Sequence, residues 1–231
     1  MTDTAKPPAR DPFDLPDVST LTVGVLGGTG EQGRGLAYRW AQAGQRVIIG
    51  SRDEQRAQAV AADLGATVEG ATNVVCAARA DVVVAAVPWA GHEALLTELR
   101  TALVGKIIVD CVNPLGFDKQ GAFALAVEQG SAAQQAAELL PDSTVVAAFH
   151  HISAVLLLDG SVPTLDTDVR VLGDKREATD TVQALANRIP GLRGIYGGRL
   201  RNAAQVEAFT ANLISINRRY KAHGGVRITD V

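Results

Sequence analysis

Short apolar runs alternate along the chain with longer segments of helical periodicity. Residues 81–87 are an almost uninterrupted apolar run, as expected of a strand that is buried on both faces of a sheet. Strands are predicted at residues 21–26, 46–50, 66–69, 81–87, 106–110, 144–148, 169–172 and 192–195, and helices at residues 31–43, 53–64, 73–79, 92–103, 132–139 and 175–188. This alternation predicts an α/β fold, with a Rossmann-like, doubly wound and mostly parallel sheet followed by a C-terminal helical segment.

The two ends of the chain depart from this pattern. Residues 1–20 are predicted to be a disordered extension, because their prolines block regular structure and few of their residues are apolar. A last helix begins near Asn202, and its apolar residues recur at steps of three and four. They are Val206, Phe209, Leu213, Ile216 and Tyr220. This face packs either on the chain's own sheet or against a second subunit.

A glycine-rich turn directly follows the first predicted strand. Gly28, Gly30 and Gly33 have the spacing G-x-G-x-x-G, and a helix-like stretch comes next. Such a turn allows a tight bend, a close approach of the backbone to a pyrophosphate, and close packing of the helix on the strand. The helix also directs its free N–H groups and positive dipole end at the phosphates. The motif therefore predicts a dinucleotide site. The alternative is a glycine-rich turn that binds no ligand.

The end of the second predicted strand indicates which dinucleotide binds. Sites for NAD place an acid there to bind the ribose 2′-hydroxyl. This chain has Ser51 and Arg52 instead, with Arg56 one helical turn later. A hydroxyl and two guanidinium groups suit a 2′-phosphate, which an acid would repel. The cofactor is therefore predicted to be NADP.

Composition narrows the class of protein. The residues are 47% apolar and only 4% aromatic, which favours a core of Ala, Val, Leu and Ile. No run spans a bilayer and no signal peptide is recognised, so a cytoplasmic protein without membrane partners is expected. Cys76 and Cys111 have neither metal-ligand nor disulfide spacing, and no metal site is expected. The net charge of −3 argues against nucleic-acid binding, although residues 192–231 carry seven basic residues and two acids.

Ligands of open α/β sheets bind beyond the carboxyl ends of the strands. Five segments are expected to converge there, namely the glycine turn, Ser51–Arg52, Pro88–Trp89, residues 113–115 and residues 150–154. Pro88 and Trp89 would cover one side of the cofactor, and Leu115 and Ala154 would lie near its nicotinamide end. His150 is the most interesting polar group there, either active or hydrogen-bonded to the backbone. No Tyr-x-x-x-Lys pair, acidic dyad or metal cluster is found, so hydride transfer between two cofactors fits best.

The combination of Gly27-Gly28-Thr29-Gly30, Gly50-Ser51-Arg52, Val87-Pro88-Trp89 and residues 149–154 resembles the coenzyme F420-dependent NADP oxidoreductases. The stretch Asn217-Arg218-Arg219-Tyr220-Lys221 is similar to actinobacterial members, and the similarity covers residue 21 to the C-terminus. In that family reduced deazaflavin and NADP exchange a hydride in a shared pocket. The resemblance therefore implies NADP and coenzyme F420 as the two cofactors, and a homodimer is expected.

The same resemblance implies roles for single residues. Thr29, Gly30, Glu31 and Gln32 would bind phosphates, and Ser51, Arg52 and Arg56 the 2′-phosphate. Trp89, Leu115 and Ala154 would line the NADP site, while His150, Ile152 and Val226 would lie near the stacked rings, with His150 in an orienting role. Residues 21–198 would be the NADP-binding domain, and residues 199–231 would complete the second-ligand site.

Two other functions stay open. The chain could be an NADP-dependent reductase of a small imine or keto acid, which needs a proton donor near the nicotinamide. Only His150 or His151 could serve as that donor. It could also be a non-catalytic NADP-sensing module, although the basic C-terminal segment is not needed for that role.

Overall fold

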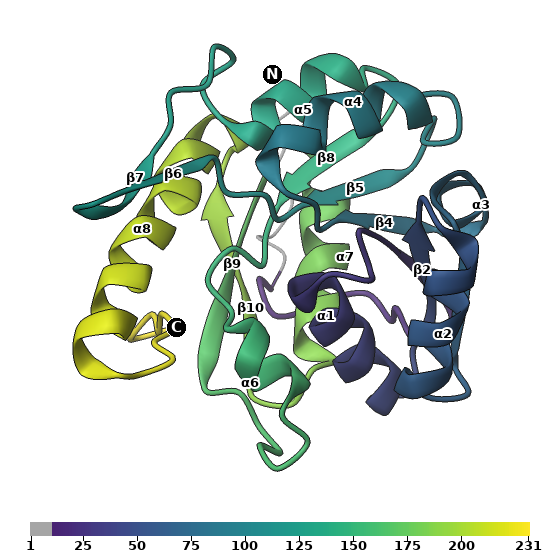
Figure 1. Cartoon of the computed structure of the whole chain (residues 1–231), viewed down its shortest axis with the longest axis horizontal. Helices are drawn as coiled ribbons and strands as arrows, with labels where there is room; N and C mark the ends of the chain where they lie inside the picture. The colour runs from purple at the N-terminus through teal and green to yellow at the C-terminus, as the bar shows by residue number, and fades with distance from the viewer. Residues whose placement is uncertain (1–10) are drawn as a thin grey trace, which may run out of the picture.

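An eight-stranded sheet forms the centre of the molecule (Figure 1). The structure is a computed structural model that describes residues 11–231. The strand order is β10-β9-β8-β5-β4-β1-β2-β3, and every neighbouring pair is parallel except β8 with β9. The strands are β1 (Thr22–Leu26), β2 (Arg46–Ser51), β3 (Val68–Thr72), β4 (Val82–Ala85), β5 (Ile107–Asp110), β8 (Thr144–Ala147), β9 (Thr167–Gly173) and β10 (Leu192–Gly198). The predicted Rossmann-like, mostly parallel fold is confirmed.

Helices cover both faces of this sheet, because both faces of its central strands are apolar. One buried cluster joins the sheet to α1 and α7 and the second joins it to α4 and α5. The helices are α1 (Glu31–Gln42), α2 (Glu54–Leu64), α3 (Asn73–Arg79), α4 (Trp89–Leu99), α5 (Ala132–Leu139), α6 (Ala154–Leu158), α7 (Arg176–Asn187) and α8 (Ala203–Tyr220). None of the helices in the described part of the chain is long and apolar enough to cross a membrane.

Two elements were not predicted from the sequence. The glycine-rich segment after Pro114 is an antiparallel hairpin of β6 (Leu115–Asp118) and β7 (Gly121–Ala124), which projects from the body of the molecule. The short helix α6 follows Ser153, whose hydroxyl oxygen accepts a hydrogen bond from the Leu156 N–H at 3.4 Å. Strands β6 and β7 were not recognised because neither is a continuous apolar run, and α6 was not recognised because five consecutive apolar residues show no helical period.

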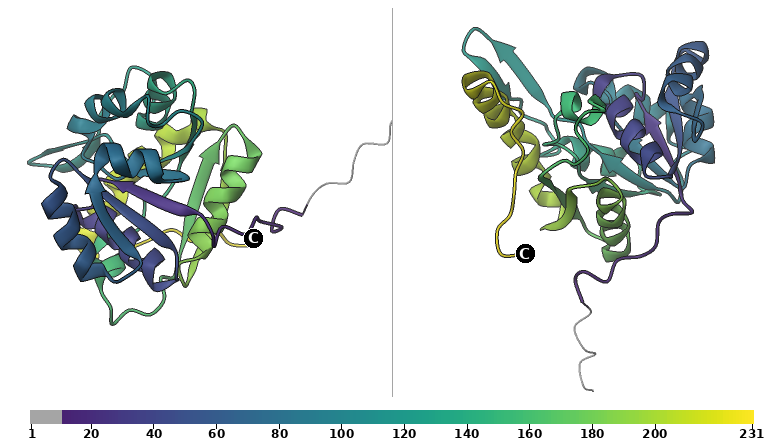
Figure 2. Two further views of the ribbon diagram at one scale, coloured as in Figure 1. Left: turned by 90° about the vertical axis from the view of Figure 1, so that its right-hand side faces the viewer. Right: turned by 90° about the horizontal axis from the view of Figure 1, so that it is seen from below.

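Helix α8 is packed as far as Leu213 and is exposed at its C-terminal end. Val206 and Leu213 are buried, whereas Ile216 and Tyr220 are 41% and 70% exposed. Helix α8 lies beside β7, and both stand apart from the main sheet when the molecule is viewed from below (Figure 2). The predicted apolar face is therefore divided between the chain's own interior and solvent.

The expected N-terminal extension is too long. Residues 1–10 lie outside the described part of the chain, but Val18 is only 3% exposed and Leu15 packs against the same core. The buried side chain of Gln45 donates to the carbonyl oxygens of Val18 and Leu21, at 2.9 and 2.5 Å. The prediction of disorder was wrong for these last residues, because isolated apolar residues in or after a proline-rich segment carry no periodic signal.

Val18→Ala should therefore lower the free energy of unfolding. Removing two buried methyl groups costs about 1–2 kcal/mol at roughly 0.8 kcal/mol each. Urea unfolding followed by circular dichroism measures the difference. Phe13→Ala is the control, because Phe13 is 68% exposed and its loss should change stability by less than about 0.5 kcal/mol. Equal effects of the two substitutions would show that Val18 does not belong to the core.

Candidate functional site

The carboxyl ends of β1, β2, β4, β5 and β8 meet at one edge of the sheet, because these strands are mutually parallel. All five segments expected to form the site follow these strands. Strand β9 runs in the opposite direction, so its first residues reach the same edge. The C-terminal tail joins it there, since the Asp168 N–H donates to the Val226 carbonyl oxygen at 2.7 Å. Val226 thus lies at the edge where the other candidate residues gather.

The glycine turn after β1 has a backbone conformation and a close packing that residues with side chains could not adopt. Gly27 has a φ of 72°, in the left-handed region that favours glycine. A Cβ on Gly28 would overlap the side chain of Ile49, and one on Gly33 would lie 2.7 Å from the Gly27 carbonyl oxygen. The tightest bend therefore falls on Gly27, one residue before the recognised motif, while Gly28 and Gly33 allow the turn, β2 and α1 to pack closely.

The first turn of α1 presents free backbone donors. Gly30 is the N-cap residue and supplies no side-chain hydrogen bond to the N–H groups that follow. Thr29 is half-buried and Glu31 is exposed beside this end. The Gln32 side chain instead donates to the Phe149 carbonyl oxygen at 3.2 Å, which ties α1 to the segment after β8. An uncapped helix N-terminus of this kind suits a pyrophosphate.

The turn after β2 carries two exposed arginines. The Ser51 hydroxyl oxygen accepts from the Asp53 N–H at 3.2 Å, and the Asp53 carboxylate caps α2 by accepting from the Arg56 N–H at 3.1 Å. The side chains of Arg52 and Arg56 are exposed, and within residues 11–231 neither is bonded to a carboxylate. Both guanidinium groups are therefore available to a phosphate.

Two further segments form the walls on either side of β4 and β5. Pro88 is the N-cap residue of α4, and Trp89 is the first residue of this helix and half-buried. Leu115 is half-buried at the start of β6, where the hairpin leaves the sheet. The centroids of the Trp89 indole and the His92 ring are 5.5 Å apart. The position of Trp89 therefore depends on a residue deeper in the protein.

The segment after β8 is unusual in its backbone. Phe149 has a φ of 64°, which is rare for a bulky residue, and its buried ring packs edge-on against Trp40 at 5.5 Å. His150 and Ile152 follow, 7% and 8% exposed, and Ala154 begins α6. Strained backbone of this kind persists only where its surroundings hold it, and it often marks a functional segment.

The two adjacent histidines are both neutral. Burial lowers the pKa of His150 to about 3, aided by the nearby His151 and Arg170, and its Nε2 has no hydrogen-bond partner among the described residues. Burial and Arg170 likewise lower the pKa of His151 to about 4. His151 Nε2 donates to the Val206 carbonyl oxygen at 2.6 Å, and its Nδ1 accepts from the Arg170 guanidinium. Neither ring holds an ionisable proton at neutral pH.

The C-terminal tail closes this end of the site. His223 Nδ1 lies 3.3 Å from the Ser153 hydroxyl, and a small cavity of about 70 Å³ separates the tail from residues 151–153. The exposed Arg218, Arg219 and Lys221 immediately precede this contact. His223 could not be selected from the sequence, because a single histidine in a polar tail has no pattern around it.

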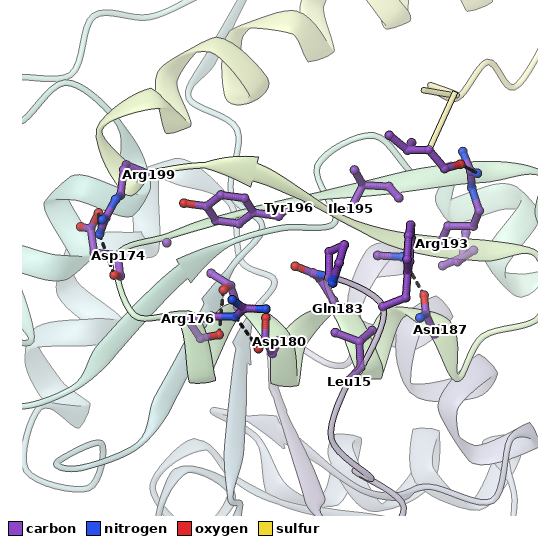
Figure 3. Close-up of a pocket in the computed structure, with 17 residues that line it drawn as sticks. Leu15, Asp174, Arg176, Asp180, Gln183, Asn187, Arg193, Ile195, Tyr196 and Arg199 are labelled. Atoms are coloured by element: carbon purple, nitrogen blue, oxygen red, sulfur yellow. Dashed lines mark hydrogen bonds and ion pairs between the residues drawn. The ribbon is translucent and has the colours of Figure 1, made fainter. Parts of the chain in front are cut away.

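A much larger cavity, of about 820 Å³, lies away from these residues at the free edge of β10 (Figure 3). Three arginines line it, but each is neutralised. Arg176 pairs with Asp180, Arg199 lies near Asp174, and Arg193 is bonded to Asp168. This cavity lacks the unpaired cations expected of a site for a phosphorylated cofactor, and none of the sequence-predicted site residues lines it.

Several buried polar residues near the site were not predicted. Arg39, His92, Asp110 and Glu207 are all less than 9% exposed. A possible signal was their placement in otherwise apolar stretches, as with Asp110 at the end of a buried strand. Their partners come from distant parts of the sequence, so the network itself could not be deduced.

Comparison with known proteins points to one family. Residues 22–114 match the family model described as NADP oxidoreductase, coenzyme F420-dependent. The F420-dependent NADP reductase of Methanothermobacter thermautotrophicus is 39% identical over 226 residues, which cover 93% of this chain and 97% of that protein. The corresponding protein of Methanocaldococcus jannaschii is 34% identical, covering 91% and 99%.

A solved structure of a protein with a similar description also resembles this chain. The crystal structure of a candidate F420-dependent NADP-reductase from Arthrobacter sp. FB24 superimposes with a TM-score of 0.78 at 28% identity. The match covers 90% of this chain and 99% of that chain. Two relatives are more than 30% identical to this chain over nearly its whole length. The glycine turn and Ser51-Arg52 agree with the same family. The chain belongs to the family of F420-dependent NADP reductases.

Proposed function

We propose that this protein transfers a hydride between coenzyme F420, a deazaflavin, and NADP. The observation that carries the proposal is the 39% identity over 226 residues to the F420-dependent NADP reductase of Methanothermobacter thermautotrophicus. The chemistry of the transfer belongs to the two cofactors, which need only be held face to face. The protein therefore has to bind and orient both rings and exclude water from between them.

The residues at the edge of the sheet fit NADP. The uncapped first turn of α1 offers N–H groups to the pyrophosphate, and the unpaired Arg52 and Arg56 offer charge to the 2′-phosphate. Trp89, Leu115 and Ala154 would form the walls around the nicotinamide. On this proposal Ile152 and Val226 lie on the side of the second cofactor, beside His150.

The state of the histidines favours hydride exchange over reduction of an imine or keto acid. Such a reduction needs a proton donor beside the nicotinamide, and His150 and His151 were the only candidates in the sequence. Both are neutral at pH 7, and the remaining N–H of His151 is committed to the Val206 carbonyl oxygen. Transfer between two cofactor rings requires no such donor.

The test is to mix the protein with oxidised deazaflavin and NADPH and to follow the visible absorbance of the deazaflavin. Catalysed bleaching that depends on the protein would support the proposal. If NADPH binds and the absorbance does not change, the NADP-sensing module or the imine reductase becomes the better account. Reduction of a cyclic imine in a parallel assay separates those two.

His150→Ala should reduce turnover only modestly, because a histidine with a pKa near 3 cannot supply a proton at pH 5–8. We expect a fall of less than about tenfold, well short of the roughly 10²–10⁴-fold that loss of a general acid produces. The pH profile of kcat should keep its shape in the variant. Disappearance of one limb of that profile would mean that His150 is a proton donor.

The basic end of α8 should attract the second cofactor. Coenzyme F420 carries a phosphodiester and a glutamate tail, and Arg218, Arg219 and Lys221 are exposed cations beside the contact between His223 and Ser153. Their attraction should be screened within about 8–10 Å at physiological salt. The Michaelis constant for the deazaflavin should therefore rise with ionic strength, more steeply for long-tailed than for tailless cofactor.

The double variant Arg218→Glu/Lys221→Glu should abolish that difference between cofactors and leave the Michaelis constant for NADP unchanged. A double variant that keeps the full dependence on salt and tail length would show that the cluster is an ordinary solvated surface.

We also propose a cytoplasmic homodimer. Large apolar side chains are exposed on the β6–β7 hairpin and on the C-terminal end of α8, notably Phe117, Phe123, Ile216 and Tyr220. A two-stranded hairpin is only marginally stable by itself, so a second copy that covers this surface would stabilise it. Sedimentation equilibrium of the protein and of Phe117→Asp tests the proposal. A monomeric native protein would contradict it.

A further inference from the structure

A buried ion pair lies directly behind the proposed nicotinamide site. His92, on α4, and Asp110, at the end of β5, are both fully buried, and His92 Nε2 lies 2.6 Å from Asp110 Oδ2. On the other side of the ring, Nδ1 lies 3.1 Å from the side-chain oxygen of Gln135, on α5. The Gln135 amide nitrogen faces Gln129 Oε1 at 3.5 Å, which agrees with this orientation of the amide. His92 is therefore held between two oxygens.

Two acceptor oxygens favour a proton on each ring nitrogen of His92, and so favour the protonated form of the ring. Burial opposes this charge, but the hydrogen bonds and charges of Asp110 and its neighbours outweigh it and raise the pKa of His92. A buried pair of this kind has little freedom, because loss of either partner leaves an uncompensated charge in the interior. The pair can therefore hold α4 and the end of β5 in a fixed position relative to each other.

Both walls of the proposed site are attached to this pair. The indole of Trp89 lies against His92, with the ring planes at 33° and the centroids 5.5 Å apart. The second oxygen of Asp110 accepts from the Val112 N–H at 3.0 Å, and so sets the direction of the chain towards Asn113 and Leu115. One ion pair thus holds a residue from each of the two walls.

Helix α8 is linked to the same assembly. Glu207 is 2% exposed, and its two oxygens accept from the N–H groups of Ala132 and Ala133, at 2.8 and 3.1 Å, at the start of α5. On the next turn, Thr210 Oγ1 lies 3.0 Å from Asn113 Oδ1 and 3.4 Å from the His150 carbonyl oxygen. The helix that supports the second-cofactor side is therefore bonded to both α5 and the wall after β5.

We propose that His92 and Asp110 are positioning residues, which set the separation and orientation of Trp89 and residues 112–115 around the nicotinamide. The inference rests on the proposed function, in that it takes these two segments to be the walls of the NADP site. Neither residue needs to touch the cofactor. The adenosine end of NADP lies at the glycine turn and Arg52, so its binding should not depend on the pair.

Calorimetric titration with two ligands tests this separation. Adenosine 2′,5′-bisphosphate probes the adenosine end alone, and NADPH probes both ends. The variants are Asp110→Asn, which keeps the shape of the side chain, and His92→Gln. Gln45→Met is the matched control, because Gln45 is fully buried and hydrogen-bonded but precedes β2 at the opposite edge of the sheet. All proteins are compared below their melting temperatures.

In the two site variants, NADPH should bind about tenfold more weakly, since small displacements of a binding wall have effects of this size or larger. The fragment should bind within about twofold of the native protein, and Gln45→Met should change neither constant. Equal weakening of both ligands, or unchanged NADPH binding in Asp110→Asn, would overturn the inference. Failure of the native protein to bind either ligand would instead overturn the proposed NADP site, and the inference with it.

Discussion

Arg52→Ala should raise the Michaelis constant for NADP by about tenfold or more, because a hydrogen bond between charged groups contributes roughly 1.5–3 kcal/mol. The same substitution should leave the Michaelis constant for NAD nearly unchanged, because NAD has no 2′-phosphate. Arg52 is exposed and bonded to no carboxylate within the described residues, so its removal disturbs no internal ion pair. Steady-state rates with each nucleotide and saturating deazaflavin provide the measurement.

Arg100→Ala is a suitable control for this experiment, since Arg100 is also an exposed arginine but lies at the far end of α4. It should change neither Michaelis constant. Equal losses for NADP and NAD in Arg52→Ala would show that Arg52 supports the turn after β2 and does not select the phosphate.

Arg39→Met should produce the largest loss of stability. The guanidinium of Arg39 is buried and donates to four backbone carbonyl oxygens in and after α6, those of Leu156, Leu157, Asp159 and Val162, at 2.6–2.9 Å. Methionine fills similar space but leaves these acceptors without donors. Leaving buried acceptors without donors costs roughly 1–3 kcal/mol each, so we expect a loss of at least about 3–5 kcal/mol, equivalent to a fall in Tm of roughly 6–20 °C in a protein of this size.

Differential scanning calorimetry of Arg39→Met, Arg39→Lys and Arg176→Met checks this expectation. Lysine has fewer donors than arginine and should give an intermediate Tm. Arg176 is an exposed partner in a pair four residues apart on α7, so its loss should cost less than about 0.5 kcal/mol. A Tm for Arg39→Met as high as that of Arg176→Met would mean that water satisfies the four carbonyl groups.

The features that could be predicted from sequence are those with local causes. Strand β4 and helix α7 were predicted to within one or two residues of their ends, because the pattern of buried positions is visible in neighbouring residues of the sequence. The glycine turn and Ser51-Arg52 were recognised for the same reason, since each is a short contiguous segment. Their common location followed from a general rule of parallel sheets.

What could not be predicted depends on contacts between distant segments. The antiparallel pairing of β9 with β8 could not be deduced, because the apolar pattern of a strand does not indicate in which direction the strand runs. Arg39 joins α1 to residues more than 110 positions away, and His92 reaches Asp110 and Gln135 from separate elements. The burial of Val18 likewise depends on Gln45, which the local sequence around Val18 does not reveal.

Transfer of a labelled hydride tests the central claim most directly. The protein is incubated with oxidised deazaflavin and NADPH that carries deuterium at the transferred position of C4, and the reduced deazaflavin is analysed by mass spectrometry. Direct transfer predicts one deuterium in each reduced deazaflavin, from one face of the nicotinamide only. Reduction without incorporation of deuterium, or no reduction although NADPH is bound, would contradict the proposal that this chain holds the two cofactors face to face.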